Sequence, residues 1–72
     1  MAKVLHLLKG DPSLACSVIA AQAAAGDTVT VALLEGEAPV LPTGVTLRRL
    51  EADLAYGELV DLIFDADHVI PW

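Results

Sequence analysis

The chain has 72 residues, enough for one small domain, and 56% of them are apolar, far too many for a disordered segment. Ten acidic residues outnumber four basic ones, so the formal net charge is −6 at pH 7, which argues against direct binding of nucleic acid or of an anionic membrane. One cysteine cannot form an internal disulfide, and a domain of this size buries only about 60% of its unfolded surface, so we expect an oligomer or a partner subunit to add stability.

The first two elements are predicted by an apolar run and a helix-start signal. Residues 4–8 (VLHLL) are almost continuously apolar, which is typical of a strand buried on both faces of a parallel sheet. Asp11 followed by Pro12 indicates a helix start, because the carboxylate can accept from free backbone N–H groups and a proline there loses no hydrogen bond. We therefore expect a helix over residues 12–25, ended by Gly26.

Two more strands are predicted in the middle of the chain. Residues 28–34 (TVTVALL) are β-branched and apolar and predict the second strand. Residues 35–44 hold two prolines and two glycines and predict a loop. Residues 45–50 (VTLRRL) predict a third, more polar strand, which we place nearer an edge, followed by a turn over residues 51–56.

The last helix and strand are predicted by periodicity. Residues 57–66 read as a helix with an acidic solvent face and an apolar face toward the sheet. The acidic face carries Glu58, Asp61 and Asp65, and the apolar face carries Leu59, Leu62, Ile63 and Ala66. Residues 68–70 predict a short closing strand, which Pro71 ends or places at an edge.

This order of elements predicts an α/β fold in one domain over residues 1–72, with a four-stranded, mostly parallel sheet. The β-α-β start requires a parallel pair and a right-handed crossover, and we expect the first strand to be central. No signal peptide is recognised, because His6 and Lys9 interrupt the first apolar run, and the longest uncharged stretch, residues 12–26, is too short and too rich in alanine to span a bilayer. With a lone thiol and no signal, we expect a cytoplasmic protein.

The first predicted helix carries no charged residue, although a helix on one face of a sheet usually has a charged outer side. At about 100° per residue, Leu14, Val18 and Ile19 define a bulky side. Small residues lie roughly opposite: Ser13, Cys16, Ser17, Ala20 and Ala24. These would let another subunit approach closely, or the alanines simply favour the helix. Gln22, near the bulky side, fits the interface interpretation poorly.

Cys16 is the only thiol and the only candidate catalytic residue. One interpretation is a sulfur nucleophile or persulfide carrier, which needs an accessible, activated thiolate. The other is a small buried apolar residue, which is the usual state of a free cysteine, and residues alone favour this second interpretation.

No other group of residues forms a convincing site. His6, among leucines, is expected to be a hydrogen-bonded core histidine, and His68 a solvated one, with no metal site and no cofactor site. The turn over residues 9–13 could hold an anion, but it lacks a glycine-rich fingerprint. Arg48 and Arg49 should point to opposite faces, and we expect one of them to pair with Glu51 or with another chain.

Three segments resemble the DsrH/TusB family. Residues 4–9 (VLHLLK) followed by Pro12 are similar to the family's opening strand and its turn of Lys/Arg-Ser-Pro type. Residues 59–72 are similar to its end, a short strand with a terminal Trp, and residues 26–36 to its second strand and the acidic glycine turn that follows.

The resemblance implies a small three-layer DsrE-like fold and a role in a sulfur relay. In that family, hetero-oligomers with DsrE/DsrF-like (TusC/TusD-like) subunits pass persulfide sulfur between cysteines, for 2-thiolation of the tRNA wobble uridine or for sulfur oxidation. Some members carry a first-helix cysteine, at the place of Cys16. The better-known sulfur-accepting cysteine follows a later strand in the DsrE/TusD-type partner, and this chain has none there. We therefore expect either a persulfide carrier acting through Cys16 or a non-catalytic scaffold subunit.

Overall fold

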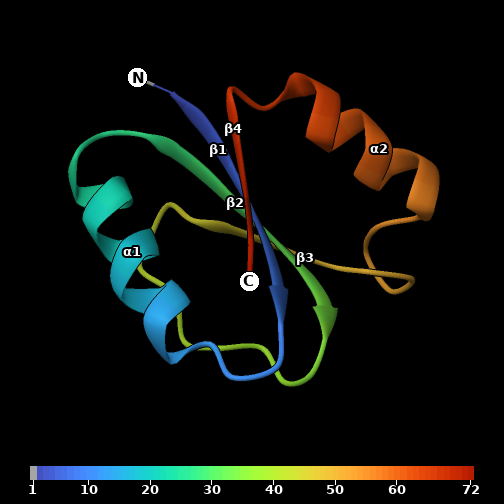
Figure 1. Cartoon of the computed structure of the whole chain (residues 1–72), viewed down its shortest axis with the longest axis horizontal. Helices are drawn as coiled ribbons and strands as arrows, with labels where there is room; N and C mark the ends of the chain where they lie inside the picture. The colour runs from blue at the N-terminus through green and yellow to red at the C-terminus, as the bar shows by residue number, and fades with distance from the viewer. Residues whose placement is uncertain (1) are drawn as a thin grey trace.

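The computed structural model describes residues 2–72, which form one layer of four strands between two helices. The elements, in chain order, are β1 (Lys3–Lys9), α1 (Ser13–Ala24), β2 (Thr28–Glu35), β3 (Thr46–Arg49), α2 (Tyr56–Asp65) and β4 (His68–Pro71). All strands are parallel, in the order β3-β2-β1-β4 (Figure 1). The predicted α/β class and four-stranded parallel sheet are confirmed.

β1 is an inner strand, as predicted, because it pairs with β2 on one side and with β4 on the other. The two edge strands are the short, more polar ones. β3 carries Arg48 and Arg49, and β4 ends at Pro71, which has no backbone N–H to donate to a neighbour. The sheet thus keeps its most apolar strands in the middle.

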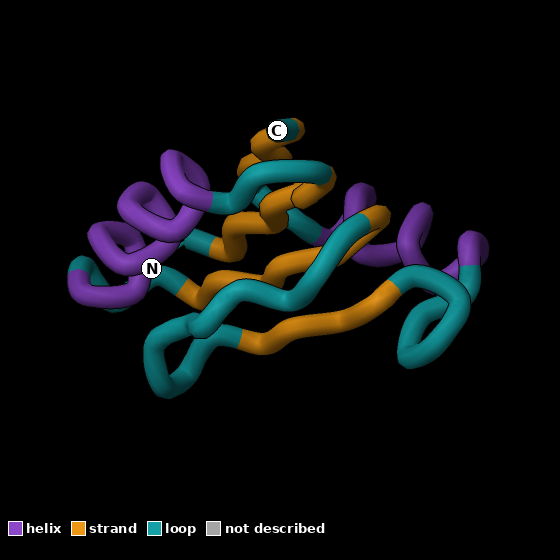
Figure 2. Tube along the Cα trace, turned by 90° about the horizontal axis from the view of Figure 1, so that it is seen from below, coloured by secondary structure: helices purple, strands orange, loops and turns teal. Residues whose placement is uncertain are grey.

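Each face of the sheet has its own apolar core. Leu8, Val29, Val31 and Leu33 face one side and pack with Ile19 of α1. Leu5 and Ala32 alternate with them along the same strands and therefore face the other side, where the α2 residues Leu59 and Leu62 pack. The two helices consequently cover opposite faces, with the strands between them (Figure 2).

The ends of α1 agree with the sequence signals to within one residue. Asp11 Oδ1 accepts hydrogen bonds from the Ser13 backbone N–H at 3.0 Å and from Ser13 Oγ at 2.7 Å. The helix ends before Gly26, whose φ of 91° lies in the left-handed region that favours glycine.

The rotation of α1 about its axis differs from the prediction. Ala15 and Ile19 are buried, whereas Leu14, assigned to the bulky side, is 75% exposed. Cys16, assigned to the outer side, is half-buried. Most residues expected outside are indeed exposed: Ser13, Ser17, Ala20 and Ala24. With no charged residue on α1, the sequence could not fix which apolar positions face the sheet.

The inward face of α2 is narrower than predicted. Leu59, Leu62 and Ala66 pack against the sheet, but Ile63 is 36% exposed and lies at the margin of the contact. The acidic residues Glu58, Asp61 and Asp65 are exposed, as expected.

Candidate functional site

Cys16 is a free, half-buried cysteine in the second turn of α1. Its backbone N–H donates to the Pro12 carbonyl at 2.8 Å, as in any helix, and within residues 2–72 its thiol has no hydrogen-bond partner. Neither of the two ion pairs in this part of the chain, Lys3–Asp65 and Arg48–Glu58, places a cationic side chain beside Cys16. No neighbouring base is positioned to take the proton of this thiol, so its reactivity depends on how well a reagent can reach it.

The turn before α1 is already occupied by a carboxylate. The hydrogen bonds from the Ser13 hydroxyl and then the Ser13 backbone N–H lower the pKa of Asp11 below its ordinary value of 3.8. Asp11 therefore stays ionised near neutral pH and repels an incoming anion at this helix end. The anion interpretation of residues 9–13 finds no support here.

His6 is fully buried and hydrogen-bonded at both ring nitrogens, which confirms the core-histidine prediction. The Trp72 indole N–H donates to His6 Nδ1 at 2.9 Å, and an indole N–H can only donate. His6 Nδ1 is therefore unprotonated, and Nε2 carries the proton and donates to Gln22 Oε1 at 2.6 Å. The same contact explains why the polar Gln22 lies near the bulky side of α1, because its side chain makes a hydrogen bond inside the fold.

His6 and Cys16 do not belong to one site. Gln22 points to His6 from α1, and at about 100° per residue Cys16 lies roughly 120° around the helix from Gln22. Cys16 is thus on the other flank of the helix, and the buried histidine cannot serve as its base. His68, as expected, is exposed on β4.

Glu51, the partner expected within the chain for one of the β3 arginines, is wrong for Arg48. Arg48 Nη2 lies 3.6 Å from Glu58 Oε2 of α2 and donates to the Asp53 carbonyl at 2.7 Å, so it does not pair with Glu51. The reason is the register of β3: Arg48 pairs with Ala32, whose side chain faces α2. Arg49 is exposed on the next position and points to the opposite face.

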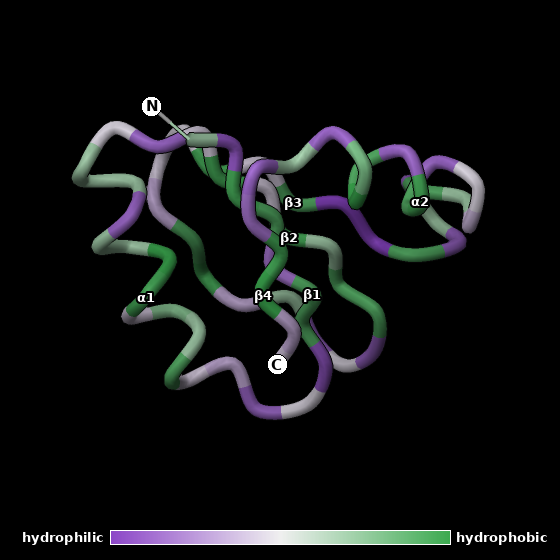
Figure 3. The backbone as a smooth tube through the Cα atoms, turned by 45° about the horizontal axis from the view of Figure 1, so that its top comes forward, coloured by the Kyte–Doolittle hydropathy of each residue, from purple (hydrophilic) through white to green (hydrophobic). Residues whose placement is uncertain are grey.

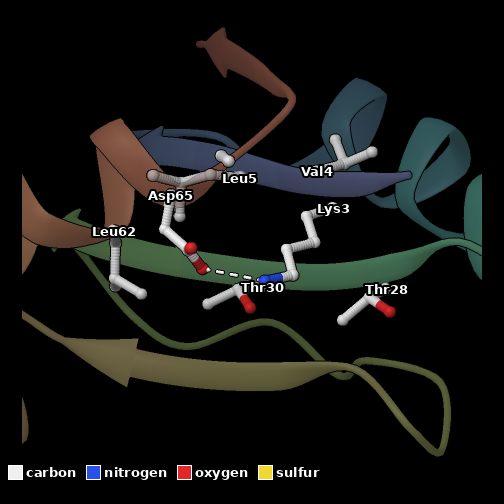
Figure 4. Close-up of a pocket in the computed structure, with 8 residues that line it drawn as sticks. Lys3, Val4, Leu5, Thr28, Thr30, Leu62 and Asp65 are labelled. Atoms are coloured by element: carbon white, nitrogen blue, oxygen red, sulfur yellow. Dashed lines mark hydrogen bonds and ion pairs between the residues drawn. The ribbon is translucent and has the colours of Figure 1, made fainter. Parts of the chain in front are cut away.

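A small cavity of about 130 Å³ lies where α2 leaves the amino end of β1 and β2 uncovered (Figure 4). Thr28 and Thr30 line it, and Lys3 Nζ and Asp65 Oδ2 form an ion pair of 3.2 Å across it. Both ion-pair side chains are well exposed, so the pair adds little stability, and the cavity holds room for only a few water molecules.

The feature that the sequence analysis missed is an apolar stripe on the outer side of α2. We define the apolar stripe as Tyr56, Val60, Ile63 and Phe64. Their spacing of four, seven and eight residues from Tyr56 places them on one side of the helix, next to the sheet-facing side of Leu59 and Leu62, with Ile63 at the border. Phe64 is 85% exposed, Tyr56 63% and Val60 48%. Hydrophobic and hydrophilic positions alternate around α2 (Figure 3).

The spacing that defines the apolar stripe was visible in the sequence. It could not be separated from the sheet-facing side, because apolar residues occupy most of the circumference of α2 outside the acidic face. Only the contacts with Leu5 and Ala32 show which apolar residues are covered.

Two general features of residues 2–72 bear on function. No group of three or more His, Cys, Asp or Glu side chains in this part of the chain is placed to hold a metal ion. Neither of the two described helices has the length and hydropathy needed to cross a bilayer.

Comparison with known proteins found no matching protein family, no matching curated protein and no matching solved structure.

Proposed function

We propose that this protein is a subunit of a sulfur-relay assembly of DsrH/TusB type, in which it supplies binding surfaces rather than an autonomous transferase activity. The observation that carries the interaction role is the apolar stripe, whose four large apolar side chains are between 36% and 85% exposed in a small domain. The resemblance of residues 4–12, 26–36 and 59–72 to that family supports the relay as the kind of assembly.

The exposed stripe favours an interaction role for an energetic reason. Each apolar side chain of this size gains about 1.5–3 kcal/mol when it leaves water completely, so the stripe offers a partner several kcal/mol of gross stabilisation. Cys16, in contrast, lacks a neighbouring base or any hydrogen bond to its thiol within the described residues. The geometry thus favours binding over catalysis.

Co-expression with DsrE- and DsrF-like subunits of the same genome tests the assembly. We expect a heteromeric complex of defined mass in size-exclusion chromatography with light scattering. A chain that elutes alone in the presence of each of these subunits would contradict the sulfur-relay proposal.

A second candidate function, sulfur carriage by Cys16, is favoured by its state as a free cysteine that is only half-buried. The Cys16 thiolate would attack the outer sulfur of a donor cysteine persulfide, forming a new S–S bond on Cys16. The S–S bond of the donor breaks, and the donor cysteine leaves as a thiolate. Sulfane sulfur moves without net oxidation or reduction, and no cofactor is needed.

Mass spectrometry after incubation with a cysteine desulfurase and cysteine tests this carrier role. A carrier gains one sulfur atom on Cys16, and Cys16→Ser abolishes the gain. The matched control is Cys16→Ser combined with Ser17→Cys, because Ser17 is exposed one position along the same helix. If the relocated thiol gains sulfur equally well, loading reflects simple exposure and Cys16 has no special role.

A further inference from the structure

We infer that the apolar stripe binds a basic amphipathic helix of another protein, with an apolar side flanked by Lys or Arg, rather than a second copy of this chain. This inference rests on the proposed interaction role and adds the chemistry of the partner. It follows from the charged side chains that border the stripe and from the basic residues of the chain that form no ion pair with α2.

The acidic side of α2 has one carboxylate without an intrachain ion pair. Asp65 pairs with Lys3 at 3.2 Å, and Glu58 lies 3.6 Å from Arg48 and accepts from the Ala55 backbone N–H at 3.0 Å. The Asp61 side chain takes part in no ion pair or hydrogen bond between residues 2 and 72. It is exposed, which leaves its charge available to a partner.

Asp61 also lies where a helix docked on the stripe would contact it. At about 100° per residue, Asp61 lies roughly 60° from Phe64 around α2, at the border between the apolar stripe and the acidic side. A helix packed on Phe64 and Val60 therefore places its own flanking residues next to Asp61. A lysine or arginine there gains an ion pair, and a carboxylate there is repelled.

The charge of the chain argues against a second copy as the occupant. Two copies bring together −12, twice the net charge of −6. Of the four basic residues, Lys3 and Arg48 are engaged with the acids of α2, which leaves Lys9 and Arg49. An anionic partner such as nucleic acid or an acidic membrane meets the same repulsion. A basic partner is attracted by the net negative charge of the chain and by Asp61.

Two synthetic helical peptides test the inference directly. They share one leucine stripe and differ only in the flanking residues, which are lysine in one and glutamate in the other. In fluorescence anisotropy with labelled peptides, we expect the lysine peptide to bind at least about tenfold more tightly at low salt, with the preference shrinking as salt rises.

Variants of the full chain assign the binding to the stripe. Val60→Ser combined with Phe64→Ser should weaken binding of the lysine peptide by at least about tenfold, since large apolar side chains dominate such contacts. Leu14→Ser is the control, because Leu14 is also a large apolar residue, 75% exposed, but lies on α1. Asp61→Lys should remove most of the preference for lysine, whereas Glu37→Lys, the same charge change in an exposed loop, should keep it.

Four results would overturn the inference: equal affinity for the two peptides, a Leu14→Ser effect as large as that of the stripe variant, a Glu37→Lys effect as large as that of Asp61→Lys, or a dimer of the chain that Val60→Ser with Phe64→Ser dissociates. The two proposals fail separately. A chain that binds the lysine peptide through the stripe but ignores the DsrE- and DsrF-like subunits contradicts only the sulfur relay. A relay complex that survives the stripe variant contradicts only the docking surface.

Discussion

Replacement of His6 by leucine should lower the free energy of unfolding by about 2 kcal/mol. Leucine fills much of the buried space but cannot accept from the Trp72 indole N–H or donate to Gln22 Oε1. Each unsatisfied polar group costs about 1–3 kcal/mol when it is buried. Water reaches Trp72 and Gln22 in part, so each of these two groups should cost about 1 kcal/mol. Urea denaturation followed by far-UV circular dichroism measures the loss.

The matched control for this variant is His68→Leu. His68 is exposed on β4 and takes part in no side-chain hydrogen bond found within residues 2–72, so its replacement should change the free energy of unfolding by less than about 0.5 kcal/mol. Equal losses for the two histidines would contradict the buried hydrogen-bond chain from Gln22 through His6 to Trp72.

Replacement of Ile19 by alanine should have the larger effect, a loss of about 2–5 kcal/mol. Ile19 is completely buried between α1 and the sheet, where it contacts the core of Leu8, Val29 and Val31. The free energy of unfolding of a small domain is only about 5 kcal/mol or somewhat more, so this variant should lose a large part of it and unfold at a clearly lower temperature. Thermal and urea denaturation of the purified variant measure the change.

Leu14→Ala is the control on the same helix. Because Leu14 is 75% exposed and alanine favours the helix, this variant should stay within about 0.5 kcal/mol of the wild type. A loss at Leu14 comparable to that at Ile19 would mean that α1 is rotated relative to the structure, with Leu14 toward the sheet.

The sequence was sufficient for the elements and their order, because their boundaries depend on local signals. Asp11 and Gly26 determine the ends of α1 through a hydrogen-bonded carboxylate and a left-handed backbone, and both effects act within a few residues. The continuous apolar run of β1 predicted an inner strand, since both faces of that strand are covered.

The rotation of the helices could not be predicted in the same way. α1 has no charged residue to mark its solvent side. The sequence therefore gives no sign that Leu14 is exposed and Ala15 is buried. The buried hydrogen bond of Gln22 depends on His6 and Trp72, which are far apart in the chain. The pairing of Arg48 with Glu58 depends on strand register.

The candidate site was predicted only in part. Cys16 was found as the sole thiol, but its half-buried state and the lack of a nearby base follow only from the three-dimensional arrangement. The apolar stripe was not separated from the core, because the short four-stranded sheet covers only part of the apolar surface of α2. Which apolar residues stay exposed depends on the extent of the sheet.

We propose that this protein acts through the outer side of α2. Hydrogen–deuterium exchange of the complex with a DsrE- or DsrF-like subunit, compared with the free chain, tests it most directly. We predict slower exchange over residues 56–65 on complex formation and unchanged exchange over residues 13–24. Slower exchange confined to α1 around Cys16, with α2 unaffected, would contradict the account.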